Sequence, residues 1–113
     1  MEFHHERENI SINRFESMLK TNSVLFFDAE EFESIANYYL ETGKIALARK
    51  AVSLGLDQHP TSTNLKLYRA EIFIYENKFD KANVLLSELH ELDPTNEEIY
   101  IQKANIYLSL IHI

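Results

Sequence analysis

The sequence predicts an all-α protein made of antiparallel helices, and three observations support this fold class. Apolar residues recur at three- and four-residue spacing along most of the 113 residues, which is the period of an amphipathic helix. Glycine and proline occur only twice each, too rarely for the many tight turns of a sheet protein. The segments between the periodic stretches are two to four residues long, and loops of that length join antiparallel neighbours.

The N-terminal segment, residues 1–28, is expected to hold one short helix over about 11–20. Its apolar stripe consists of Ile12, Phe15, Met18 and Leu19. Polar residues at 21–23 interrupt this pattern. The apolar run that follows, 24–27, is too short to be classified by its period.

The second helix is expected to begin at Ala29. Asp28 is a good N-cap, and Glu31 three residues later completes a capping-box pair. Phe27 and Phe32 have the spacing of a hydrophobic staple. The helix should end at Gly43, because glycine readily takes the left-handed conformation that closes a helix.

The third helix is expected over about 44–58. It must stop before Pro60, because the residue that precedes a proline avoids helical backbone angles. Thr61 or Ser62 then caps a fourth helix, which runs to about residue 76. Asn77 is expected to end it, since asparagine is second only to glycine at left-handed positions.

The last two helices follow the same logic. The fifth is expected over 79–92 and ends before Pro94. Thr95 and Glu98 have the spacing of a capping box for the sixth, which runs towards Leu110.

The chain repeats itself with a period of 34 residues, which separates Pro60 from Pro94 and Ala48 from Ala82. Small residues recur at this period at Ala36, Ala70 and Ala104. Aromatic residues recur at Tyr39, Phe73 and Tyr107. Small residues would let paired helices approach closely, and the aromatic residues one turn later would fill the space beside them.

This period, with two helices per unit, resembles the tetratricopeptide repeat (TPR) over about 29–110. The resemblance implies an α-solenoid, in which helix-turn-helix pairs stack into a right-handed array. The units would be 29–62, 63–96 and a partial third unit, 97–113. The second unit departs from the family pattern at Lys66 and Arg69, where the family prefers large apolar groups.

The resemblance also implies that the first helix of each pair lines a concave surface that binds a partner. By helical spacing, the side of these helices that is not used for packing carries Glu30, Glu33, Asn37, Leu40, Asn64, Leu67, Glu71, Ile74, Glu98, Ile101, Asn105 and Leu108. These twelve residues include acids, amides and aliphatic groups but no lysine or arginine. The expected ligand is therefore a neutral or basic, partly apolar protein segment. The alternative, that the acids are only a solvated helix face, stays open.

Some members of the family use lysines and asparagines in this groove to clamp the C-terminal carboxylate of a chaperone. Asn37 and Asn105 occupy suitable positions here, but the lysines are missing. An acidic peptide would meet like charges, so we expect no carboxylate clamp.

Composition argues against several other classes of function. The formal net charge is −7 and the basic residues are scattered, which disfavours binding to nucleic acid or to anionic lipid. The N-terminus has no long apolar stretch, so no signal peptide is predicted and a cytoplasmic location is expected. We expect no metal, cofactor or catalytic centre: there is no cysteine, and His4-His5 is interpreted as part of a solvated tail.

The sixth helix is apolar nearly all round, although no second helix follows to cover it. We expect self-association through Tyr100, Tyr107, Leu110 and Ile111. Either the chain is a piece of a longer array, or a second copy covers this surface as a homodimer. In a further alternative, the helix at 11–20 or the run 24–27 folds back over it.

The leading functional hypothesis is a non-catalytic protein-interaction module that binds a segment on its concave face. The alternative is a structural or oligomerisation segment of a longer repeat protein with no peptide ligand of its own.

Overall fold

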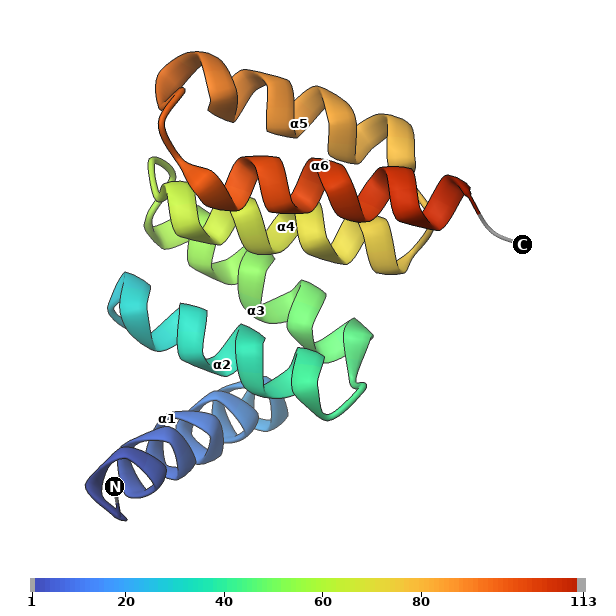
Figure 1. The fold of residues 1–113 in the computed structure, drawn as a ribbon. Coiled ribbons are helices and arrows are strands. Elements are labelled where there is room, and N and C mark those ends of the chain that lie inside the picture. Colours follow the sequence, from blue (N-terminus) through green and yellow to red (C-terminus); the bar gives the residue numbers. More distant parts are fainter. Residues whose placement is uncertain (1, 112–113) are drawn as a thin grey trace. The chain divides into compact units, whose positions relative to one another are not determined.

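The computed structural model of the chain describes residues 2–111, with side chains from residue 8 onward, and this part is helical without any strand. Its helices are α1 (Glu2–Thr21), α2 (Ala29–Glu41), α3 (Ile45–Gln58), α4 (Thr63–Tyr75), α5 (Phe79–Leu92) and α6 (Glu97–Leu110) (Figure 1). The all-α prediction is confirmed. None of these helices is long and apolar enough to cross a membrane.

The chain divides into two compact units between Ser62 and Thr63. The first unit contains α1–α3 and the second contains α4–α6. This division falls where the 34-residue period places the boundary between its first two repeats. Residues 2–28 fall in the same unit as α2 and α3.

In the first unit, α1 is longer than the short helix expected over 11–20, because it begins at Glu2. Residues 2–10 contain no glycine or proline that would stop a helix. The helix ends where Asn22 takes a positive φ of 57°. Its apolar stripe packs against α2, and Phe15 lies 6.1 Å from Tyr39, measured between ring centroids. The Tyr39 hydroxyl donates a hydrogen bond of 3.0 Å to Glu16.

The connection from α1 to α2, residues 23–28, is held by the end of α3. Gln58 Oε1 accepts a 3.0 Å hydrogen bond from the Phe27 N–H, and its Nε2 donates a 2.8 Å hydrogen bond to the Leu25 carbonyl. His59 Nε2 lies 2.7 Å from the Phe27 carbonyl oxygen. Within the apolar run 24–27, Phe27 is fully buried, whereas Val24 and Phe26 are exposed.

The predicted start and end of α2 are confirmed. Asp28 and Glu31 form the capping box, and the Phe27 and Phe32 rings lie 5.3 Å apart as the hydrophobic staple requires. Gly43 follows the helix with a φ of +76°, a conformation that few other residues adopt without strain. The next helix, α3, packs against α2, and both Ala36 and Ala48 are completely buried.

In the second unit, α4 and α5 run antiparallel, and α6 packs against both of them (Figure 1). Asn77 joins α4 to α5 with a φ of +61°, which confirms the predicted left-handed stop. The core combines two small residues with aliphatic groups from the three helices: Leu67, Ala70, Ala82, Leu86, Leu89, Ile99 and Ile106. Ala70 and Ala82 are fully buried, as their spacing predicted, whereas Ala104 on α6 is exposed.

The predicted capping box at the start of α6 is wrong. The N-cap is Asn96, whose side-chain oxygen accepts a 3.0 Å hydrogen bond from the Glu98 N–H. Asparagine is at least as good an N-cap as threonine, so the helix begins one residue later than a Thr95 cap would place it. The Thr95 hydroxyl instead donates to Asp93 over 3.2 Å.

Candidate functional site

Two of the twelve predicted contact residues lie inside the protein. Leu40 is only 8% exposed and Leu67 only 6% exposed, and Leu67 belongs to the core of the second unit. A helix whose buried stripe is wide turns these positions inward, because large aliphatic side chains gain most from burial. Leu40 and Leu67 are therefore core residues, and their prediction as partner-contact residues is wrong.

The predicted residues on α2 remain at the surface of the first unit. Glu30 is exposed, while Glu33 and Asn37 are half-buried. The Asn37 side-chain amide donates a 3.0 Å hydrogen bond to Glu41, one helical turn away. Asn64, Glu98 and Ile101 in the second unit are also exposed.

The other four predicted residues come together in one open pocket between α4 and α6. Glu71 and Ile74 line it from α4, and Asn105 and Leu108 line it from α6. Three residues that the sequence argument had not selected complete the lining: Tyr75, Gln102 and Ser109. We call this site the α4–α6 pocket. Its volume is about 350 Å³, enough for one or two amino-acid side chains but small for a drug-sized ligand.

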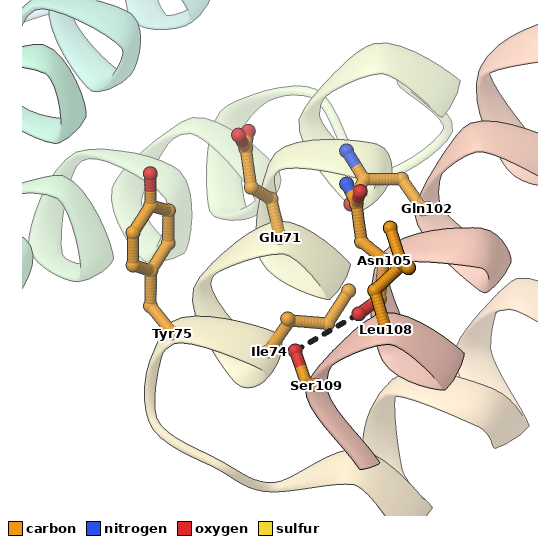
Figure 2. A pocket seen from close by; sticks show the side chains of 7 residues that line it. All are labelled: Glu71, Ile74, Tyr75, Gln102, Asn105, Leu108 and Ser109. Atoms are coloured by element: carbon orange, nitrogen blue, oxygen red, sulfur yellow. Dashed lines mark hydrogen bonds between the residues drawn. The ribbon is translucent and has the colours of Figure 1, made fainter. Parts of the chain in front are cut away.

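The pocket has an apolar and a polar part (Figure 2). The side chains of Ile74 and Leu108 point toward each other from the two helices. The amide ends of Gln102 and Asn105 extend from α6 toward α4, the helix that carries Glu71. Ser109 does not offer its proton to a ligand, because its hydroxyl donates to the Asn105 backbone carbonyl over 2.9 Å.

Negative charge dominates the electrostatics of this pocket. Burial raises the pKa of Glu71, and the nearby negative charge of Glu98 raises it further. Among the described residues, no hydrogen bond or ion pair satisfies the Glu71 carboxylate. A cation that entered the pocket would therefore not compete with a protein group for this carboxylate.

Gln102 is the most buried polar residue of the pocket, with 4% of its surface exposed. Its Nε2 donates a 3.0 Å hydrogen bond to Glu98 Oε1, which fixes the orientation of the amide. Its Oε1 is buried and has no hydrogen-bond partner. Leaving a buried acceptor without a donor lowers the free energy of unfolding, so a donor at this position would stabilise the protein.

Helical spacing contains the signal for the three missed residues. Tyr75 lies four residues after Glu71, and Ser109 lies four residues after Asn105, so each continues a predicted row by one turn. Gln102 precedes Asn105 by three residues and follows Glu98 by four.

The residues predicted for self-association all lie at the protein surface, three of them on α6 and Ile111 directly after it. The exposed fractions are 52% for Tyr100, 68% for Tyr107, 61% for Leu110 and 66% for Ile111. Tyr100 is partly held by its own unit: its hydroxyl donates to the Pro94 carbonyl over 3.1 Å, and its ring contacts His90. The α1 helix, which we considered as a cover for this surface, packs against α2.

Within residues 8–111, no three His, Asp or Glu side chains lie close enough together to hold a metal ion. The side chains of His4 and His5 fall outside the described part of the chain.

Comparison with known proteins gives no assignment, since no protein-family model, curated protein or solved structure matches the chain. The features of the described residues that bear on function are therefore the chemistry of the α4–α6 pocket and that of the α6 surface.

Proposed function

We propose that the chain is a non-catalytic protein-interaction module that binds a neutral or basic, partly apolar segment of a partner protein. The observation that carries this proposal is the convergence of Glu71, Ile74, Asn105 and Leu108 in the α4–α6 pocket. These residues were selected from the sequence as one binding face, and they come from two helices that are 34 residues apart in the repeat.

The packing of the second unit is consistent with a tetratricopeptide-like arrangement. The α4–α5 pair is a helix-turn-helix, and α6, which corresponds to α4 in the 34-residue period, contacts both members of the pair. In an array of this kind, successive first helices lie side by side and form the binding face. The α4–α6 pocket lies between two such helices, and we propose the TPR-like solenoid as the finer description of the fold.

The charge of the pocket determines which segment would bind. Glu71 has no partner cation among the described residues, and Glu98 adds a second negative charge nearby. Ile74 and Leu108 offer an apolar surface beside these acids. A segment that carries a basic side chain next to an aliphatic one complements both parts, whereas an acidic segment would be repelled.

Selection from a random peptide library displayed on phage tests this function directly. We expect the full chain to enrich peptides that combine a basic residue with an aliphatic one. Glu71→Lys should lose these peptides, because it reverses the charge of the pocket. Glu88→Lys is a matched control, since Glu88 is an exposed acid on α5 outside the α4–α6 pocket. Failure to enrich any peptide, or selection of the same peptides by Glu71→Lys, would contradict the proposal.

A chaperone-type peptide with an acidic C-terminus supplies the negative control for the same face. Calorimetric titration at low salt should detect no binding, because the face carries acids and lacks the lysines that clamp a carboxylate. Micromolar binding that disappears when Asn37 is replaced by alanine would show that we have misassigned the chemistry of the face.

A second candidate function is a structural or oligomerisation role. It is favoured by the exposure of four large apolar side chains on α6 or directly after it: Tyr100, Tyr107, Leu110 and Ile111. In this case a second copy of the chain would cover the surface in a homodimer, and association would depend on protein concentration.

A further inference from the structure

The polar part of the α4–α6 pocket contains hydrogen-bond acceptors that no group in the described part of the protein satisfies. The Glu71 carboxylate can accept several hydrogen bonds and has no partner among the described residues. Gln102 Oε1 is a further acceptor, in a side chain that is 96% buried, and it is also without a partner. Ser109 has its one donor occupied by the Asn105 carbonyl. A ligand with several N–H donors would satisfy this part of the pocket.

The orientation of the Gln102 amide is fixed by its neighbour. Because Nε2 donates to Glu98 Oε1, rotating the amide by half a turn would bring an oxygen against that carboxylate. The oxygen of Gln102 is therefore held as the unpartnered group. Gln102 lines the pocket from α6, and Glu71 lines it from the facing helix α4 (Figure 2).

The apolar lining suits the stem and the flat face of a long basic side chain. Ile74 and Leu108 face each other across the pocket, where a methylene chain would contact both (Figure 2). Tyr75 borders Glu71 on α4, and 57% of its surface is exposed. Its ring is available to stack on a planar cation.

We infer that the α4–α6 pocket is a subsite for the guanidinium group of an arginine in the bound segment. Guanidinium is planar and carries five N–H donors, so it can form a bidentate pair with the Glu71 carboxylate while it stacks on Tyr75. An ammonium group would neutralise Glu71 but offers no planar face. The inference rests on the proposed function, because it names the residue of the segment that the pocket recognises.

Three short peptides test the subsite on the full chain: acetyl-Leu-Arg-Leu-amide and the same peptide with lysine or citrulline at its centre. Citrulline has nearly the shape of arginine but no charge, so it isolates the contribution of the cation. Titrations followed by NMR would monitor the side-chain amides of Gln102 and Asn105 and the backbone amide of Glu71. No variant is needed for this comparison, so loss of folding cannot confuse it.

We expect the arginine peptide to shift these resonances and the citrulline peptide to bind about tenfold more weakly, the effect of losing one charged hydrogen-bonded contact. The lysine peptide should bind more weakly than the arginine peptide. Glu71→Gln should abolish the preference for arginine over citrulline, whereas Glu88→Gln, at an exposed site on α5, should preserve it.

Equal affinities for the arginine and citrulline peptides would overturn the subsite, as would lysine binding at least as tightly as arginine. Absence of any shift at Gln102 and Asn105 with all three peptides would overturn it as well. None of these results removes the interaction module, which fails when the library selection yields no peptide or when Glu71→Lys selects the same peptides. The two proposals can therefore fail separately.

Discussion

The clamp formed by Gln58 gives the sharpest prediction about stability. In the first unit, the two polar atoms of this side chain hold the connection between α1 and α2: Oε1 accepts from the Phe27 N–H at 3.0 Å, and Nε2 donates to the Leu25 carbonyl at 2.8 Å. Replacing Gln58 by alanine removes both bonds but keeps the helix, because alanine is a strong helix former.

The size of the effect follows from these two hydrogen bonds. Each intramolecular hydrogen bond contributes about 0.5–1.5 kcal/mol net, so losing both should lower the free energy of unfolding by about 2 kcal/mol. The cost should not fall much below this value, because the Phe27 N–H adjoins a fully buried ring and is poorly placed to find water. His59 still contacts the Phe27 carbonyl in the variant and prevents complete release of the connection.

Urea denaturation monitored by circular dichroism measures this change. We expect the midpoint of Gln58→Ala to fall by about 1 M, at the slopes typical of small proteins, with no change of slope. Asp57→Ala is the matched control, since Asp57 is the exposed neighbour on the same helix and should change stability by less than about 0.5 kcal/mol. A Gln58→Ala variant as stable as Asp57→Ala would refute the clamp.

Three further predictions concern the second unit. Ala82→Leu should destabilise the protein by about 1–3 kcal/mol, because it forces three extra carbons into a fully buried position; an unchanged melting temperature would contradict the packing of α5. The pKa of Glu71 is raised above its ordinary value of 4.5, so the ionised carboxylate destabilises the folded state at neutral pH. Glu71→Gln should therefore raise the melting temperature at pH 7. This gain should shrink as the pH falls through the pKa of Glu71 in the folded protein, and it should vanish below the pKa of Glu71 in the unfolded chain. A gain that grows on acidification would contradict the raised pKa. Light scattering over a hundredfold concentration range should show association of the chain, reduced in Leu110→Lys/Ile111→Lys; a monomer at every concentration would remove the oligomerisation candidate.

Signals that act over one helical turn were readable from the sequence. The capping box of Asp28 and Glu31 depends on residues three positions apart, and Gly43 and Asn77 act through their own backbone angles. The alanines of the repeat were placed correctly at Ala48 and Ala82, because a small residue at a fixed period indicates a close helix crossing.

Competition between neighbouring residues was harder to read. Thr95 and Asn96 are both good N-caps, and only the folded turn shows that Asn96 supplies the hydrogen bond. Similarly, no stop signal marked how far α1 extends before residue 11. Leu40 and Leu67 lay at the edge of the predicted binding face, where a small rotation of the helix separates a core residue from a surface residue.

About half of the α4–α6 pocket could be predicted from the sequence. Glu71, Ile74, Asn105 and Leu108 follow from the repeat, which places two related helices side by side. Helical spacing places Gln102 beside Glu98 and Asn105, but it does not reveal the importance of this residue, which comes from burial and from an oxygen without a donor. Both properties depend on packing between α4, α5 and α6, which a one-dimensional pattern does not contain.

The most direct test of the interaction module is an NMR map of the chain in complex with a peptide selected from the library. We expect the largest shifts at residues that line the α4–α6 pocket, above all at Glu71, Gln102 and Asn105, with little change on α5. Shifts confined to the outer surface of α6, around Tyr107 and Ile111, or absent from the second unit altogether, would contradict the assignment of the binding site.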